Sequence, residues 1–278
     1  SLEVVKSLLR GKARRDTNKT TRCLGQTPLY VATEHGHADV ALALIRAGGE
    51  VDLADSNGWT PLMCAAADGR VELVNNLLLS GAVANTRNRK GDRPLHYAVQ
   101  GGHLDVVRVL LKAGASPSSR RKLDDKSAVD LAVEAGRTSV PRELLAAGAP
   151  NAEFLDDGGL SALDIAARGG HARAIDVLVD AGTDPNGVNM DMDTSLHLAC
   201  LHLQPDSVRA LLRRNADETF CNDSFDVPGD IVGYWVVQEQ RDEEVVEWIR
   251  EVWGQIELGV RVWHRNGTLI TVRMQKHR

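Results

Sequence analysis

The sequence predicts an all-α solenoid, a stack of helix–turn–helix repeats joined by short β-turn fingers. Three observations predict it. A six-residue block recurs along the 278 residues at spacings of 33 or 34, glycine follows the block at a fixed distance, and an apolar stripe with helical spacing follows the glycine. The blocks are Thr27–Ala32, Thr60–Ala65, Arg93–Ala98, Ser127–Ala132, Ser161–Ala166 and Thr194–Ala199.

The block predicts the first helix of each repeat. The Thr or Ser that opens a block suits an N-cap, because its hydroxyl can accept a hydrogen bond from an unpaired amide, and proline suits the next position. Nine residues after the block begins, glycine supplies the positive φ that ends a helix at little steric cost. These glycines are Gly36, Gly69, Gly102, Gly136 and Gly170. Leu203 replaces the glycine in the sixth repeat, so we expect its turn to differ.

The second helix of each repeat follows as an apolar stripe such as Val106-Val107-Leu110-Leu111. It ends at a residue that tolerates a left-handed backbone. These residues are Gly48, Gly81, Gly114, Gly148, Gly182 and Asn215. The 12 or 13 residues that lead to the next block are long enough for an extended turn, which we call a finger.

Both ends of the chain depart from the repeat. Residues 1–15 match the second half of a repeat and begin with Ser1, so we expect a fragment of a longer protein. Six full repeats occupy about 16–221 and a divergent capping repeat about 222–253, which gives a repeat domain over 1–253. Residues 254–278 are predicted to form a β-hairpin tail, with Asn266-Gly267 as its turn and Trp263 opposite Ile270.

The blocks Thr60-Pro61-Leu62 and Pro94-Leu95-His96 resemble the T-P-L-H-x-A signature of the ankyrin repeat, a β-turn plus two helices in about 33 residues. The resemblance covers nearly the whole chain and implies an ankyrin-type α-solenoid. It also implies a non-catalytic scaffold for protein–protein interaction, which binds partners through its fingers and the concave groove of the first helices. The alternative is a targeting or regulatory arm of a larger enzyme or channel whose catalytic domain lies outside this sequence.

The resemblance allows the partner-binding positions to be named from the register. On the fingers they are Arg14, Arg15, Lys19, Arg22, Trp59, Arg87, Arg89, Lys90, Arg120, Arg121 and Lys122. On the first helices they are Glu34, His35, Asp68, Gln100, Glu134 and Arg168.

Three of the first four fingers are basic, and stacking would join them into one positive stripe interrupted by Asp52 and Asp55. An acidic or extended segment of a partner protein is therefore the predicted ligand. Charged tips also keep loops soluble, which is the competing interpretation. Trp59 either anchors a partner or packs on the neighbouring finger.

Other function classes find little support in the sequence. The net charge of −5 argues against a general nucleic-acid binder, and no apolar run is long enough to span a membrane. The four cysteines are scattered without a CxxC pair, and no catalytic, cofactor or metal-binding motif occurs, so we predict no enzyme activity, no cofactor and no metal. The histidines of the repeats are expected to be structural. We expect a cytoplasmic or nuclear protein, and the oligomeric state stays open.

Overall fold

The computed structural model of the chain describes residues 2–3, 6–7, 17–150, 155–231, 259–263 and 269–273. The chain divides into two compact units. The first comprises residues 1–135 with 143–149, and the second comprises residues 136–142 with 150–278.

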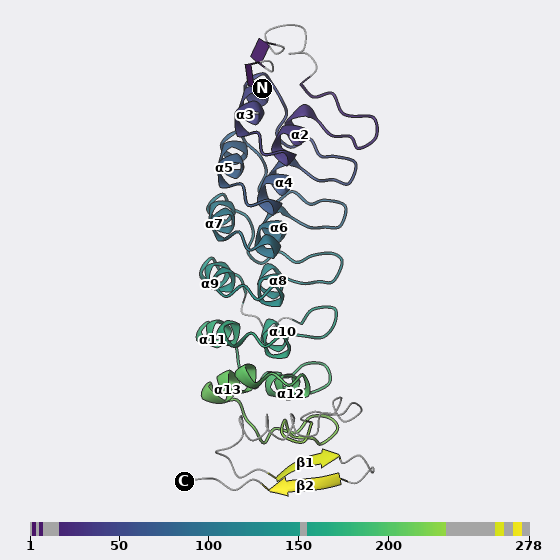
Figure 1. Cartoon of the computed structure of the whole chain (residues 1–278), viewed down its shortest axis with the longest axis vertical. Helices are drawn as coiled ribbons and strands as arrows, with labels where there is room; N and C mark the ends of the chain where they lie inside the picture. Colours follow the sequence, from purple (N-terminus) through teal and green to yellow (C-terminus); the bar gives the residue numbers. More distant parts are fainter. Residues whose placement is uncertain are drawn as a thin grey trace. The chain divides into compact units, whose positions relative to one another are not determined.

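The first unit is built from helix pairs in two layers (Figure 1). The inner layer contains α2 (Pro28–Glu34), α4 (Pro61–Ala67), α6 (Pro94–Gly101) and α8 (Ala128–Glu134), each packed against the next. The outer layer contains α3 (Ala38–Arg46), α5 (Val71–Leu79) and α7 (Leu104–Lys112). Residues of α9 (Ser139–Ala146) are shared between the two units. The fingers project beside the inner layer, and the predicted all-α repeat fold is confirmed.

The second unit repeats the arrangement with α10 (Ala162–Arg168) packed on α12 (Ser195–Leu201) and α11 (Ala172–Asp180) packed on α13 (Pro205–Arg213). Its chain also includes an antiparallel pair, β1 (Gly259–Trp263) and β2 (Leu269–Arg273). The predicted hairpin is present, but its predicted register is wrong, because Trp263 pairs with Leu269 and not with Ile270. Five residues lie between the paired residues Trp263 and Leu269. A two-residue Asn-Gly turn requires an even number of residues between paired positions.

The N-terminal ends of the inner helices follow the prediction. In α2, α4, α8, α10 and α12 the hydroxyl of Thr or Ser accepts a backbone hydrogen bond from the third helical residue, for example Thr60 from Met63. The third repeat differs because Arg93 occupies the N-cap of α6. There the backbone amide of Arg93 donates to Nδ1 of His96 at 3.2 Å, so the His96 side chain still caps the N-terminal end of the helix.

The glycine signals are also confirmed. The first glycine has φ between 66° and 77° in the five repeats that contain it, and Asn215 takes the left-handed conformation at 61° in place of the second glycine of the sixth. The expectation that the turn at Leu203 differs is wrong. Leu203 has φ 52°, and Gln204 donates its amide to the Ala199 carbonyl at 2.9 Å, as in the equivalent bond of the first repeat at 2.8 Å. The hydrogen bonds that close the turn therefore impose the backbone conformation on a residue with a Cβ.

We expect the Leu203→Gly variant to be more stable than Leu203→Ala by about 1 kcal/mol, because only glycine adopts this φ without steric cost. Both variants remove the leucine side chain, so their difference isolates the backbone. Urea unfolding of the two proteins measures it. Equal midpoints would show that the turn stores no strain.

The core lies between the helices of successive repeats. The leucines at the third position of the blocks are at most 1% exposed. They are Leu29, Leu62, Leu95, Leu163 and Leu196. Each such side chain contributes roughly 1.5–3 kcal/mol when it is buried. The alanine that ends each block is small enough to let neighbouring inner helices approach closely, which holds the fingers at regular intervals.

The half repeat and the capping repeat fall mostly outside the described residues. Residues 2–3 and 6–7 are helical, and the chain from 222 to 231 forms turns and irregular segments. None of the described helices is long and apolar enough to cross a membrane.

Candidate protein-binding surface

The tip of each regular finger is closed by one Asp or Asn side chain. Oδ1 of Asp55 accepts hydrogen bonds from the backbone amides of Asn57 and Trp59, both at 2.8 Å. Asn88 closes the next finger with two bonds of 3.0 Å. Gly58, which lies between Asn57 and Trp59, has φ 79°. The tip conformation is therefore set by local side-chain chemistry and is fixed before any partner arrives.

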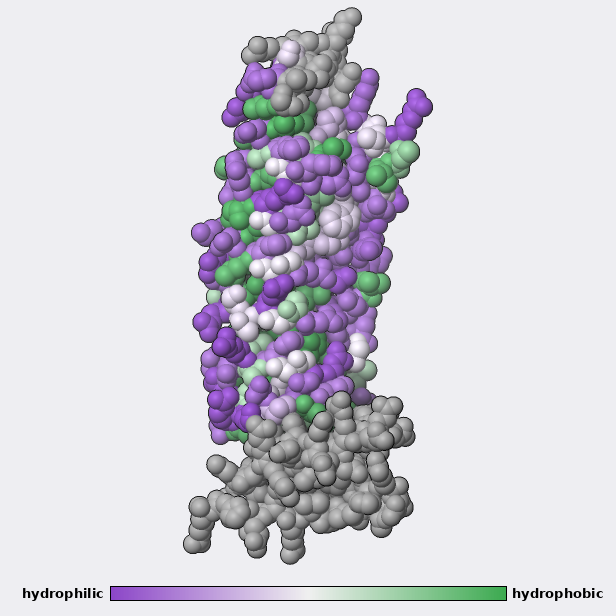
Figure 2. Space-filling model, in the orientation of Figure 1, coloured by the Kyte–Doolittle hydropathy of each residue, from purple (hydrophilic) through white to green (hydrophobic). Residues whose placement is uncertain are grey.

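Neighbouring fingers of the first unit are hydrogen bonded to each other. The amide of Arg89 donates to the Asn57 carbonyl at 3.1 Å, and the amide of Val83 donates to the carboxylate of Asp52 at 3.1 and 3.2 Å. Asp52, which interrupts the predicted positive stripe, thus has a structural use. The fingers present a continuous and ordered surface, and the face seen in Figure 2 is mostly hydrophilic with hydrophobic residues in small separate groups.

Six predicted cations are exposed on these fingers: Lys19, Arg22, Arg87, Arg89, Lys90 and Lys122. Arg87, Arg89 and Lys90 lie together on the third finger and form no ion pair with a described residue. Arg14 and Arg15 lie outside the described residues. Among the described residues of the fingers, those of the third finger therefore carry the densest cationic charge without an internal ion pair.

The fourth finger uses its arginines internally. Nε of Arg121 lies 2.9 Å from Oδ1 of Asp92, whose side chain is only 4% exposed. Arg120 pairs with Asp125 at 3.0 Å. These two cations support the finger, and Lys122 is the exposed cation beside them. The predicted positive stripe therefore has fewer available charges on the fourth finger than the sequence suggests.

Trp59 is half-buried against Tyr97 of α6, with ring centroids 4.3 Å apart. The Tyr97 hydroxyl donates to Asp92 at 3.0 Å and accepts from the Asn88 amide at 2.6 Å. Burial raises the pKa of Tyr97 to about 12, helped by the carboxylate of Asp92. The indole thus packs on the neighbouring repeat and still leaves part of its surface beside the cationic third finger.

The predicted inner-helix residues also reach the surface. Glu34, His35, Asp68, Gln100 and Glu134 are exposed, and Arg168 is partly exposed. Three of the five in the first unit are acidic. Asp68 pairs with Arg70 at 3.0 Å, and Glu134 pairs with Lys126 at 2.8 Å. Two of the three acidic side chains on the inner helices of the first unit are therefore paired within the protein.

Two residues of this surface were not predicted. Tyr97 supports Trp59, and Arg70 holds Asp68 while its Nη2 donates to the Glu34 carbonyl at 3.4 Å. Arg70 occupies the position after the first glycine that His103 holds in the next repeat, so the register alone could have identified it. Tyr97 has no such signal, because it stands at the fifth position of its block, where the other blocks carry an apolar residue.

Three of the repeat histidines, His96, His103 and His197, form the predicted structural hydrogen bonds. Nε2 of His96 lies 3.2 Å from the Ser119 carbonyl on the next finger, and Nε2 of His103 lies 2.9 Å from the Ala67 carbonyl of the preceding repeat. Burial lowers the pKa of His96 and keeps the ring neutral. Among the described residues no group of three or more His, Cys, Asp or Glu side chains is arranged to hold a metal ion.

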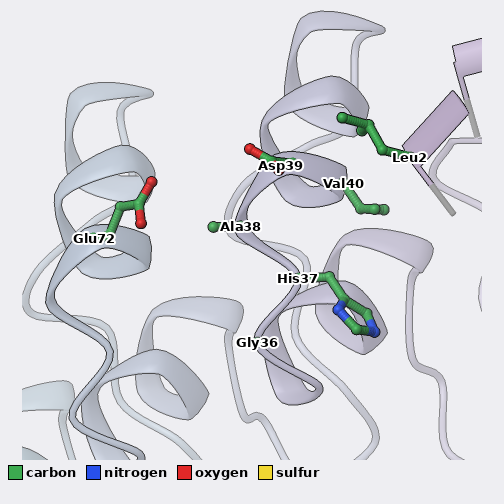
Figure 3. Close-up of a pocket in the computed structure, with 7 residues that line it drawn as sticks. All are labelled: Leu2, Gly36, His37, Ala38, Asp39, Val40 and Glu72. Atoms are coloured by element: carbon green, nitrogen blue, oxygen red, sulfur yellow. The ribbon is translucent and has the colours of Figure 1, made fainter.

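A pocket of about 530 Å³ lies at the start of α3, where Leu2, His37, Val40 and Glu72 contribute to its wall (Figure 3). Its polar side chains do not pair a nucleophile with a base. Elsewhere in the first unit, burial raises the pKa of the Cys64 thiol to about 11, so that thiol stays protonated.

Stacked helix pairs joined by ordered polar fingers define a helical repeat protein. A family model for ankyrin repeats matches residues 1–88, 44–121, 66–153 and 129–221. The chain therefore belongs to the ankyrin repeat family, whose domains are generally protein–protein interaction modules.

Two solved structures share this fold. The human ASB11 ankyrin repeat domain is 24% identical with a TM-score of 0.69, over 81% of this chain and 96% of that one. The ankyrin repeat domain of Bcl-3, described as a unique member of the IkappaB protein family, is also 24% identical with a TM-score of 0.68, over 81% of this chain and 99% of that one. A search of curated proteins finds no match.

Proposed function

We propose that this protein is a non-catalytic scaffold that binds an acidic or extended segment of a partner protein through the fingers and inner helices of its first unit. The observation that carries the proposal is the cluster of Arg87, Arg89 and Lys90, exposed without an internal ion pair on a finger of fixed conformation. Their charges are available to a carboxylate-rich partner, whereas those of Arg120 and Arg121 are satisfied within the protein.

Two physical features favour binding at this finger. The tip is already closed by hydrogen bonds from Asn88, so association loses little backbone entropy there. Trp59 lies beside the cations on a supported ring, and Trp and Arg are the side chains that most often dominate binding energy at interfaces. Charge complementarity adds to the association rate and makes it sensitive to salt.

The proposal is tested by affinity capture from the source cell extract followed by mass spectrometry, with the native protein and an Arg87→Glu/Arg89→Glu variant. We expect the variant to lose partners that the native protein retains, and we expect high salt to release the same partners. Circular dichroism must show that both proteins are folded.

Arg142→Glu/Arg173→Glu is the matched control. Both arginines are exposed on outer helices, and the two substitutions change the net charge by the same amount. The control should keep the partners of the native protein. Identical partner sets for all three proteins would contradict binding at the third finger.

A further inference from the structure

Two neighbouring fingers of the second unit carry a bulky apolar residue at a position where Gly58, Gly91 and Gly159 occupy other fingers and Asp125 occupies the fourth. Gly58, Gly91 and Gly159 have φ of 79°, 82° and 73° at the tip. Met192 and Phe225 stand at the equivalent position with φ of 58° and 64°. A side chain in this left-handed conformation costs roughly 1–2 kcal/mol relative to the ordinary helical region. Glycine at these two positions would give a more stable fold, so the side chains of Met192 and Phe225 lower the stability of the protein.

The same two fingers expose apolar surface. Met190 is 71% exposed, Met192 is 38% exposed and Phe225 is 87% exposed, and these are the large exposed apolar side chains among the described residues of the second unit. The two fingers are in contact, because Nδ2 of Asn222 donates to Asp193 at 2.8 Å. We call Met190, Met192 and Phe225 the apolar tip patch. Concentration of such side chains on one surface is typical of an interaction site.

The surroundings of the apolar tip patch are acidic. Residues 183–193 and 215–231 contain no Lys or Arg. They contain Asp184, Asp191, Asp193, Asp217, Glu218, Asp223, Asp226 and Asp230. Asp191 and Asp223 are exposed and form no ion pair with a described residue. A surface of this charge repels nucleic acid and anionic membranes and attracts cations.

We propose that the apolar tip patch binds a basic segment of a partner protein that carries apolar anchor side chains. The anchors cover Met190, Met192 and Phe225, and the Lys or Arg side chains of the segment meet Asp191 and Asp223. This charge preference is the reverse of that on the third finger of the first unit, and the proposal stands independently of that surface. Flexible methionines fit anchors of different shape, so the chemistry of the segment decides recognition more than one particular sequence does.

The test uses fluorescence anisotropy with a labelled synthetic peptide that alternates Lys and Leu. The key variant is Met192→Gly/Phe225→Gly, because glycine fits the positive φ at both positions and the variant should fold at least as well as the native protein. We expect roughly tenfold weaker binding for each anchor contact removed, which follows from the burial energy of one large apolar side chain. A peptide that alternates Lys and Ser should bind at least tenfold more weakly to the native protein.

Leu203→Gly is the backbone control, since it also relieves a left-handed leucine but lies in a helix turn away from the tips. It should bind the Lys-Leu peptide like the native protein. The Arg87→Glu/Arg89→Glu variant should bind the Lys-Leu peptide as tightly as the native protein or more tightly. This measurement therefore tests the apolar tip patch separately from the binding proposed for the third finger. Unchanged binding to the double glycine variant, or equal binding of the Lys-Ser peptide, would overturn the proposal. A concentration-dependent dimer that the glycine variant abolishes would assign the patch to a second copy and would overturn it too.

Discussion

Replacing Arg121 with alanine is expected to lower the free energy of unfolding by about 3–5 kcal/mol, the usual cost of removing one partner of a buried ion pair. The whole of Asp92 is 3% exposed, and its carboxylate accepts from Nε of Arg121 at 2.9 Å and from the Tyr97 hydroxyl at 3.0 Å. Without the guanidinium a buried negative charge keeps only one neutral donor. Urea unfolding with an unchanged m-value measures the loss.

Two further variants identify the cause. Lys122→Ala removes the exposed neighbouring cation and should change stability by less than about 0.5 kcal/mol. Arg121→Ala combined with Asp92→Asn removes both charges and should be less destabilised than the sum of the two single changes. A loss below about 1 kcal/mol for Arg121→Ala would show that water replaces the guanidinium and that the pair does not support the finger.

The fold was predictable because each repeat is specified by short-range rules. A hydroxyl at the N-cap, a proline after it and a glycine nine residues later each act within one helix, and their recurrence sets the helix pairs and the fingers. The two wrong predictions, the turn at Leu203 and the register of the hairpin, each relied on a single local sequence feature. Leu203 was judged by its own side chain, although the hydrogen bonds of the turn decide its φ, and the Asn-Gly pair was assigned a two-residue turn that the strand register excludes.

The binding surface was less predictable, because long-range contacts decide which charges remain available. Arg87 and Arg121 look alike as basic finger residues in the sequence. They differ because Asp92, which lies 29 residues before Arg121, is buried beside only one of them. Trp59 similarly finds its partner in Tyr97, a residue of the next inner helix. The sequence identifies which residues could bind a partner. Packing between repeats decides which of these side chains support the fold and which remain available to a partner.

Two leucines of α5 provide the clearest expected contrast in the core. Leu77 is fully buried between helix layers, whereas Leu79 is 87% exposed at the end of the same helix. Leu77→Ala should lower the free energy of unfolding by about 2–5 kcal/mol, because it removes buried apolar surface and leaves a cavity that the surrounding helices fill only in part. Leu79→Ala makes the same chemical change and should alter stability by less than about 0.5 kcal/mol.

The effect of Leu77→Ala should spread beyond its own repeat. Helix α5 packs against α3, α4 and α7, so a cavity there weakens the interfaces to both neighbouring repeats, and in a repeat protein those interfaces carry the cooperativity of unfolding. Hydrogen exchange should therefore show reduced protection in α3, α4, α5 and α7 together, with Leu79→Ala indistinguishable from the native protein. Reduced protection confined to α4 and α5 would mean that each repeat of the first unit opens independently. Similar stability of the two alanine variants would contradict the burial of Leu77.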